Sequence, residues 1–148
     1  MSALAAEIAA HARAESPLWE EALRTDAAFE PVFSPLCEER FALALETIYE
    51  GYLLHYGASR LFAPADRDTA LLLGDALYAQ GLVQLAALGE TGPVGELGQL
   101  ISLCAQHRGD GAEGDGEAWA DTAARLGGAA ATAEARTDAL ATHARLLG

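Results

Sequence analysis

The 148-residue sequence contains no lysine and no asparagine, so all nine of its basic side chains are arginines. Against them stand 22 acidic residues, which give the chain a formal net charge of −13. A chain with so few cations is repelled by phosphate backbones and by anionic lipid surfaces. The composition therefore argues against nucleic-acid binding and against electrostatic attachment to a membrane.

Long apolar runs are also missing from the sequence. The longest apolar segment is interrupted by Asp75, Gln80 and Gln84, so it falls short of the roughly 20 apolar residues that span a bilayer. The N-terminal segment MSALAAEIAAHARAE lacks the basic start of a secretory signal and contains Glu7. We therefore expect no membrane span and a cytoplasmic location.

Cysteine is scarce, with only Cys37 and Cys104 in the chain. Both lie in apolar contexts, and a disulfide between them is not expected in a cytoplasmic protein. Cys104 and His107 form a Cys-x-x-His pair, but two ligands without a second pair do not make a metal site. We expect buried structural cysteines, no metal ion and no cofactor.

The common catalytic motifs are missing as well. The sequence has no H-E-x-x-H, no G-x-S-x-G and no glycine-rich loop of the kind that cradles phosphate. Glu46 and Glu50 are four residues apart and would share one face of a helix. A di-iron bundle also needs Glu-x-x-His, which does not occur. These two acids are therefore expected on a solvated face or in a local ion pair.

Helical periodicity is what the sequence does contain, and no segment shows the alternation typical of a strand. Ser16-Pro17 and Ser34-Pro35 are typical helix starts, and Gly57 is a typical helix end. We predict an all-α, single-domain bundle of about six helices. The expected helices cover residues 2–14, 16–30, 34–56 and 66–88, then a segment from residue 93 and two helices in the tail.

The expected domain covers residues 1–148 and has three parts. Residues 36–108 form the central bundle, and residues 109–117 form a flexible acidic loop rich in glycine. The tail, residues 118–148, is rich in alanine and is expected to be helical, with a break at Gly127-Gly128. Alanine favours helix but buries little surface, so the tail is either a cover on the bundle or a docking element.

The helix expected at residues 66–88 is apolar nearly all round, which is typical of the buried centre of a bundle. Its one internal acid, Asp75, follows Gly74. A buried carboxylate must be paired, because an unpaired one is very costly. Alternatively, Asp75 faces a cavity and binds a ligand. The candidate partners of a paired Asp75 are Arg40, Arg60, Arg67, Arg108 and His55.

Two segments of the chain resemble the polyprenyl (isoprenyl diphosphate) synthase family. One is similar to the family's helix L-x-G-D-x-L-x-A, and its matching positions are Leu73, Gly74, Asp75, Leu77 and Ala79. The other lies upstream and is similar to E-x-I-H-x-x-x-L-x-H-D-D-x-x-D. Its matching positions are Glu46, Ile48, Leu53 and His55. The resemblance covers about residues 36–108 and implies an isoprenoid-synthase-like helical core.

The chain departs from this family at the positions that carry its chemistry. Tyr56 and Gly57 stand where the family has paired aspartates, and Arg60 stands at the third aspartate position. In the family these aspartates hold the magnesium ions that bind the allylic diphosphate. Tyr, Gly and Arg cannot replace a cluster of carboxylates as magnesium ligands. The second aspartate-rich segment has no counterpart, so the resemblance implies a degenerate relative without the metal site.

Three hypotheses on function follow. The first is a non-catalytic accessory or binding subunit, a degenerate partner of a prenyl diphosphate synthase, that binds another protein or forms a homo-oligomer. The second is a binder of a lipid-like or quinone-like molecule in an apolar cavity. The residues expected to line that cavity are Tyr49, Tyr52, His55, Asp75 and Tyr78. The third is an enzyme of unrecognised chemistry, for which the sequence assigns no catalytic residue.

Overall fold

The computed structural model describes residues 2–147, which contain seven α-helices and three short 3-10 turns. This confirms the prediction of an all-α single domain. The only β pairing among the described residues is an isolated bridge between Leu23 and Phe62. The helices are α1 (Ala3–Glu15), α2 (Pro17–Ala22), α3 (Ala42–Tyr56), α4 (Arg67–Ala87), α5 (Gly92–Asp110), α6 (Asp115–Arg125) and α7 (Ala133–Leu147), and the 3-10 turns are η1 (Ser34–Leu36), η2 (Glu39–Phe41) and η3 (Gly128–Ala130).

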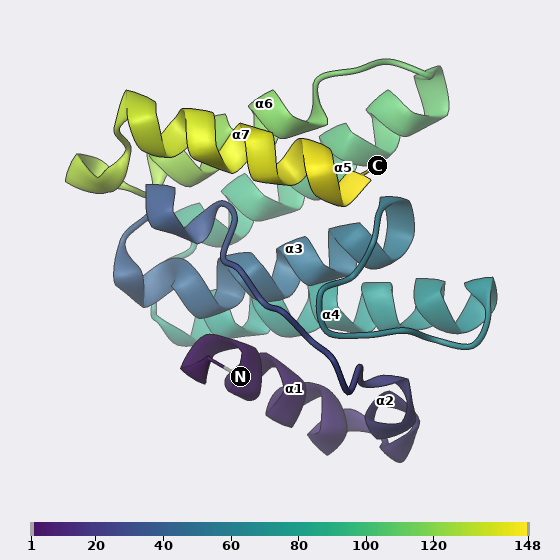
Figure 1. Ribbon diagram of the computed structural model, residues 1–148. Helices are drawn as coiled ribbons and strands as arrows, with labels where there is room; N and C mark the ends of the chain where they lie inside the picture. The colour runs from purple at the N-terminus through teal and green to yellow at the C-terminus, as the bar shows by residue number, and fades with distance from the viewer. Residues whose placement is uncertain (1, 148) are drawn as a thin grey trace.

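The helices form layers around the pair α3 and α4, which lie side by side at the centre of the molecule (Figure 1). Helices α5, α6 and α7 cover one side of this pair, and α1 and α2 lie on the other side (Figure 1). The extended segment 24–33 crosses between these two sides and leads from α2 to η1 (Figure 1). Helix α3 therefore has neighbours on several sides, and nearly every residue in its middle is buried.

The predicted helix starts at Ser2, Ser16 and Asp66 are confirmed by their capping hydrogen bonds. The Ser2 hydroxyl accepts from the Ala5 N–H, Ser16 from Leu18 and the Asp66 carboxylate from Thr69. Such caps satisfy N–H groups that have no acceptor within the helix. The expected helix from residue 16 to about 30 is wrong in its length, because α2 ends at Ala22 and the chain then runs extended. The expected helix from residue 34 is interrupted, with η1 and η2 preceding α3.

Three glycines, Gly51, Gly74 and Gly81, lie where α3 and α4 approach closely. A Cβ atom at Gly51 would lie 2.8 Å from the carbonyl oxygen of Gly74, and a Cβ at Gly74 would lie 2.7 Å from the His55 ring. Real Cβ atoms do not approach other atoms this closely, so both positions need glycine. Gly74 in the G-D pair is thus explained by helix packing against α3.

Helix α4 corrects one prediction, because it is not the fully buried centre of the bundle. Its outer face is exposed, with Leu72 at 65% and Val83 at 67% of their possible exposure. By length and composition α4 would be able to cross a membrane, and one third of its most apolar window, 33%, is buried. Core helices of soluble proteins share this composition, so the expected absence of a membrane span stays a prediction.

The predicted acidic loop at residues 109–117 is also corrected. Helix α5 continues to Asp110, and α6 already begins at Asp115, so the connection between the helices is four residues long. Gly111 has a φ of 66° and Gly114 a φ of 122°, which glycine adopts more readily than other residues. Asp115 is buried, with 6% exposure, so this end of the segment belongs to the packed interior.

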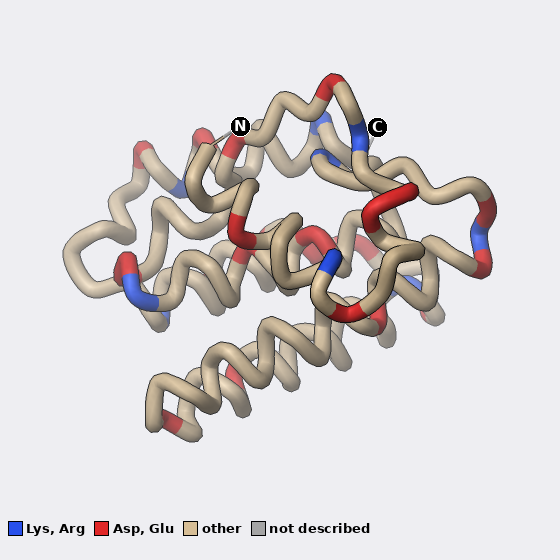
Figure 2. Tube along the Cα trace, turned by 90° about the horizontal axis from the view of Figure 1, so that it is seen from below, with Lys and Arg blue, Asp and Glu red and all other residues tan. Residues whose placement is uncertain are grey.

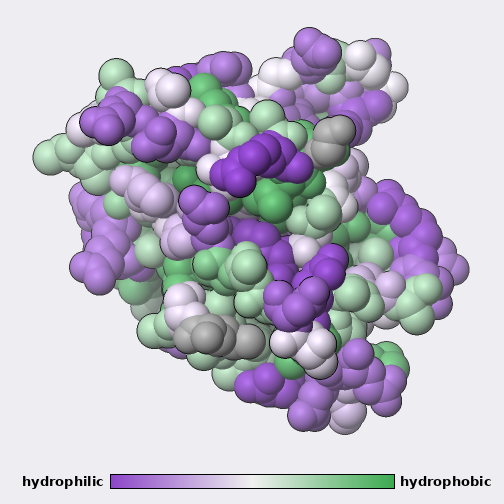
Figure 3. Space-filling model, in the orientation of Figure 1, coloured by the Kyte–Doolittle hydropathy of each residue, from purple (hydrophilic) through white to green (hydrophobic). Residues whose placement is uncertain are grey.

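Acidic residues are spread along most of the chain and outnumber the arginines (Figure 2). In the view of Figure 3, hydrophilic side chains cover much of the surface, with smaller hydrophobic areas between them. The surface is therefore acidic.

Candidate functional site

Glu46, Glu50 and Arg60 form a cluster in the interior, which we call the sealed cluster. Both glutamates lie on α3 and are completely buried, and the Arg60 side chain is nearly so. The Arg60 Nη1 atom donates to Glu46 Oε1 at 2.7 Å, and its Nε atom donates to Glu50 Oε1 at 2.6 Å. Of the two alternatives from the sequence, the solvated face is wrong, because both acids are buried and form ion pairs with Arg60.

The remaining oxygens of the sealed cluster are also occupied. Glu46 Oε2 accepts from the backbone N–H groups of Val32 and Ser34 at 3.0 and 2.8 Å. Glu50 accepts from the Ser59 hydroxyl and from the Arg60 N–H. The cluster thus holds the segments 32–34 and 59–60 against α3 and leaves no polar atom free for a ligand. Its role is structural.

A second polar cluster lies between α3 and the helices α5, α6 and α7, and Asp115 is its centre. Asp115 is the first residue of α6, so its side chain reaches back across the α5–α6 connection. Its Oδ1 atom accepts from His107 Nδ1 at 2.9 Å, and Oδ2 accepts from Arg108 Nε at 3.0 Å and from the Tyr52 hydroxyl at 2.6 Å. Three elements are joined through this one carboxylate.

These bonds decide the charge of Asp115. Burial alone raises the pKa of the Asp115 carboxyl, but the hydrogen bonds from Tyr52, His107 and Arg108 outweigh burial and hold this pKa below its ordinary value. Asp115 is therefore ionised at neutral pH, and His107 Nδ1 must donate to it. A neutral imidazole has one donor and one acceptor, so the Nε2 atom of a neutral His107 is an acceptor.

His143 reaches the same region from α7 and is 6% exposed. Its Nδ1 atom lies 2.8 Å from the Tyr49 hydroxyl. Tyr49 is fully buried, and its hydroxyl has no other hydrogen-bond partner among residues 2–147. A buried hydroxyl proton needs an acceptor, so Tyr49 donates to Nδ1 and the proton of the imidazole sits on Nε2. Burial lowers the pKa of His143, which keeps its ring neutral.

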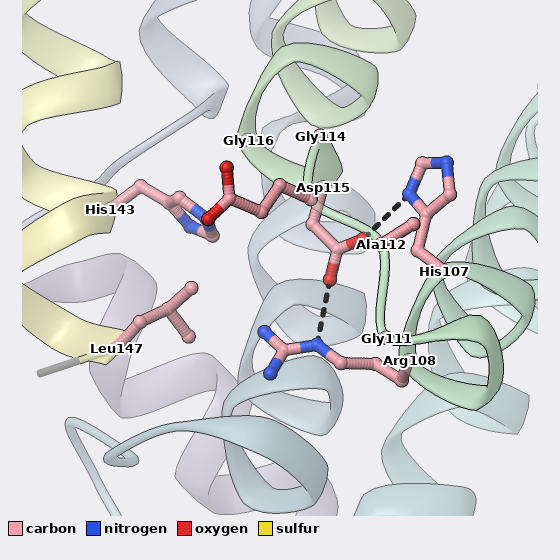
Figure 4. A pocket seen from close by; sticks show the side chains of 10 residues that line it. His107, Arg108, Gly111, Ala112, Gly114, Asp115, Gly116, His143 and Leu147 are labelled. Carbon is pink, nitrogen blue, oxygen red and sulfur yellow. Dashed lines mark hydrogen bonds and ion pairs between the residues drawn. The ribbon is translucent and has the colours of Figure 1, made fainter.

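These side chains border a cavity of about 400 Å³, which we call the α6 pocket. His143 from α7 and Arg108 from α5 point toward the start of α6 from different sides, and Asp115 lies between Arg108 and His107 (Figure 4). Gly116 permits the close approach of α7, because a Cβ there would lie 2.9 Å from His143 Cδ2. The lining residues are His107, Arg108, Gly111, Ala112, Glu113, Gly114, Asp115, Gly116, His143 and Leu147.

The structure separates the five residues that the sequence placed around one apolar cavity. Tyr49 and Tyr52 lie in the core beneath the α6 pocket, where their hydroxyls hold His143 and Asp115. His55, Asp75 and Tyr78 lie instead at the contact of α3 with α4, where the Tyr78 ring stacks on His55 at 5.1 Å. None of the five lines the α6 pocket or any of three further cavities of the described residues.

Asp75 is paired, but it is not a buried core residue. Its side chain is 69% exposed, and its Oδ1 atom lies 3.0 Å from His55 Nε2. Of the partners considered from the sequence, the structure selects His55. Asp75 lies on the exposed outer part of α4, so its carboxylate stays hydrated. The otherwise apolar helix therefore carries an acid without burying its charge.

The sequence interpretation missed Arg108, Asp115 and His143 as members of one site. Two signals would have indicated their burial. Gly114-Asp115 directly precedes the helical pattern around Trp119, which is typical of a helix start. His143 is four residues from Ala139 and from Leu147, which places all three on one face of the tail helix.

Neither cysteine takes part in the site. Cys37 and Cys104 are buried free thiols, as expected, and burial raises the pKa of each to about 12. In the described part of the chain no group of three or more histidine, cysteine or acidic side chains is arranged to hold a metal ion. The lining of the α6 pocket contains no serine, threonine, cysteine or lysine that would act as a nucleophile.

Comparison with known proteins gives no match: no family model, no curated protein and no solved structure is significantly similar to this chain. The resemblance to the polyprenyl synthases therefore stays a hypothesis that rests on two short segments. The site must be interpreted from its own geometry.

Proposed function

We propose that this protein binds a small molecule in the α6 pocket and does not transform it. One observation carries the proposal. Arg108 and His143 are each fixed by a hydrogen bond to another side chain, and each still has N–H groups without a partner among the described residues beside a cavity of about 400 Å³. Groups that are held in place and remain unsatisfied favour binding, because little side-chain entropy is lost when a ligand arrives.

The size and position of the α6 pocket support this function. Ligand pockets of proteins usually have volumes of roughly 300–1,000 Å³ and contain a few convergent polar groups. The α6 pocket lies where three helices meet, and its polar side chains come from α5, α6 and α7. This differs from the lipid-like ligand suggested by the sequence, since the polar groups favour a polar ligand.

The lack of a nucleophile in the lining supports binding without chemistry. His107 and Asp115 do form the kind of pair that orients an imidazole base. An isolated pair of this kind does not define a reaction, because the lining places no serine, threonine, cysteine or lysine beside it.

The proposal is tested by amide NMR spectra of the ¹⁵N-labelled full chain with mixtures of small polar fragments. We expect some fragments to shift the amides of residues 107–116 and 140–147 together. Gly116→Ala, which pushes a Cβ against His143, should abolish these shifts. Gly98→Ala is the matched control, because a Cβ at Gly98 on α5 would meet nothing within 4 Å. If no fragment shifts these two segments, the α6 pocket is not a ligand site.

A second function, the accessory subunit, is favoured by the outer face of α4. Leu72 and Val83 are the most exposed large apolar side chains in the described part of the chain, and they lie on the same helix. Exposed apolar faces of this kind often mark protein contacts. A partner chain, including a competent prenyl diphosphate synthase subunit, or a second copy of this chain would cover them.

Native mass spectrometry of the protein purified gently from its own cell tests this second function. A complex with a larger chain would support an accessory subunit, and Leu72→Ser with Val83→Ser should dissociate it. A monomer at all accessible concentrations, with no co-purified chain, would contradict it.

A further inference from the structure

The first turn of α6 has free backbone N–H groups, and two of its residues, Asp115 and Gly116, line the α6 pocket. The first backbone hydrogen bond of this helix runs from the Ala118 N–H to the Gly114 carbonyl, so the N–H groups of residues 115–117 have no acceptor within the helix. No side chain caps this end. Free N–H groups and the helix dipole make such an end favourable for a negative charge.

A buried side chain points to the same place. His143 is more than nine-tenths buried, and its Nε2 atom lies 3.3 Å from the position that a Cβ at Gly116 would occupy. Because Tyr49 donates to Nδ1, Nε2 carries a proton and has no acceptor among residues 2–147. The structure thus contains a second, independent donor beside the start of α6.

Arg108 provides the positive charge. Its Nε atom donates to Asp115 and its Nη2 atom to the Tyr52 hydroxyl at 3.0 Å, whereas Nη1 has no partner in the described chain. Its guanidinium lies 4.9 Å from the centre of the Tyr56 ring. The guanidinium is thus held from several sides, with three of its five N–H bonds left for a ligand, two on Nη1 and one on Nη2.

We propose that the α6 pocket binds the anionic group of its ligand, a carboxylate or a phosphate, between the first turn of α6, His143 and Arg108. The proposal rests on the ligand-binding function proposed above and names the chemistry of the ligand. The pocket offers fewer acceptors than donors. Both oxygens of Asp115 are already engaged, which leaves His107 Nε2 and the exposed carboxylate of Glu113.

Two acids line the α6 pocket, and the charge of Asp115 is paired with Arg108, so Glu113 is the lining acid whose charge most directly opposes an anion. Its carboxylate is exposed on the lining of the α6 pocket, so its removal should strengthen anion binding with little risk to folding. For Glu113→Gln we expect an anion affinity that is higher by roughly two- to fivefold, the size of an exposed charge interaction. Glu134→Gln is the matched control, because Glu134 is exposed at the start of α7 and does not line the α6 pocket.

Tyr49 is a positioning residue in this site, because it fixes the proton of His143 on Nε2. Tyr49→Phe removes one oxygen from the core and leaves His143 free to place its proton on either nitrogen. We expect the anion affinity to fall by about threefold to tenfold, the value of one hydrogen bond. Tyr78→Phe is the control, because Tyr78 stacks on His55 at another contact. Circular dichroism of both variants verifies that they fold.

The experiment is an amide NMR titration of the full chain with sodium phosphate, sodium acetate and ethylammonium chloride at constant ionic strength. We expect one or both anions to give saturable shifts of residues 114–117 with millimolar Kd, and the preferred anion distinguishes phosphate from carboxylate ligands. Saturable binding of ethylammonium that depends on Glu113, or the absence of saturable shifts with either anion, overturns the proposal. If uncharged fragments still bind there, only the anion inference fails and the ligand-binding function stands.

Discussion

Two clusters of acids and arginine pack against helix α3, and they differ in the hydrogen-bond donors that they leave without a partner. In the sealed cluster every carboxylate oxygen of Glu46 and Glu50 accepts from Arg60, Ser59 or backbone N–H groups. In the cluster around Asp115 the carboxylate is equally well satisfied, but its neighbours Arg108 and His143 have donors to spare. A polar network whose groups are all hydrogen-bonded stabilises the fold. A network with unpaired N–H donors beside a cavity is suited to binding a ligand.

The first prediction concerns Arg60, whose removal leaves two buried carboxylates without their cation. We expect Arg60→Met to lower the free energy of unfolding by about 3–5 kcal/mol, because an uncompensated buried charge is strongly unfavourable. Urea denaturation followed by circular dichroism measures this loss. Arg40→Met is the control, since Arg40 forms exposed ion pairs with Glu38 and Glu90, and its transition midpoint should not change. Equal effects of the two substitutions would contradict the structural role of the sealed cluster.

The second prediction applies the same measurement to the cluster around Asp115. Asp115→Asn should lower the free energy of unfolding by about 1–2 kcal/mol, less than Arg60→Met, because His107 and Arg108 are partly exposed and can turn to water. A loss as large as that of Arg60→Met would show that this cluster also serves mainly the fold.

The third prediction is the pH dependence that His143 gives to stability. The pKa of His143 is lowered in the folded protein, because burial outweighs the opposing charge of Asp115. The unfolded chain therefore binds the proton first, and stability is fully present above the ordinary histidine pKa of about 6.5. As the pH falls below that value, the free energy of unfolding should decrease by at most about 1.4 kcal/mol per pH unit.

The control for this prediction is His143→Gln, which should flatten the profile between about pH 7 and pH 5. Asp115, whose pKa is lowered, loses its contribution only as the pH falls below its ordinary value of 3.8, so the two groups act in different pH ranges. A profile that is the same with and without His143 would mean that this imidazole is not buried as the structure shows.

The smallest effect is expected on the outer face of α4. Leu72→Ser and Val83→Ser should each change the free energy of unfolding by no more than about 0.5 kcal/mol, because both side chains are exposed in the single chain. Denaturation at two protein concentrations measures this. A loss of several kcal/mol that grows with protein concentration would show instead that a second copy covers this face.

The sequence predicted the helices well, because their caps and apolar periods are local. The start of α4 at Asp66 and the end of α3 at Gly57 follow from single residues that perform capping. The burial of Glu46 and Glu50 was not predictable in this way, because their partner Arg60 follows a chain reversal that local patterns do not describe. The exposure of the outer face of α4 was not predictable either, because an apolar pattern in the sequence looks the same whether the face is buried or exposed.

The site was predicted only in part, and for the same reason. Tyr49 and Tyr52 were singled out as ligand residues, and in the structure they hold His143 and Asp115 from within the core. Asp115 was assigned to a mobile loop, because glycine and acid in the segment 109–117 are typical of a solvated linker. Its burial depends on Tyr52, 63 residues away, and such a distant pairing leaves no local trace in the sequence.

The most direct test of the difference between the two clusters is a long-range ¹H–¹⁵N spectrum of the imidazole nitrogens at pH 7.5, recorded with and without phosphate. We predict that His143 carries its proton on Nε2 with Nδ1 as acceptor, that the Nδ1–H of His107 donates to Asp115, and that phosphate shifts the His143 Nε2 resonance. A proton on Nδ1 of His143, together with imidazole resonances that phosphate leaves unchanged, would contradict the presence of unused donors in the α6 pocket.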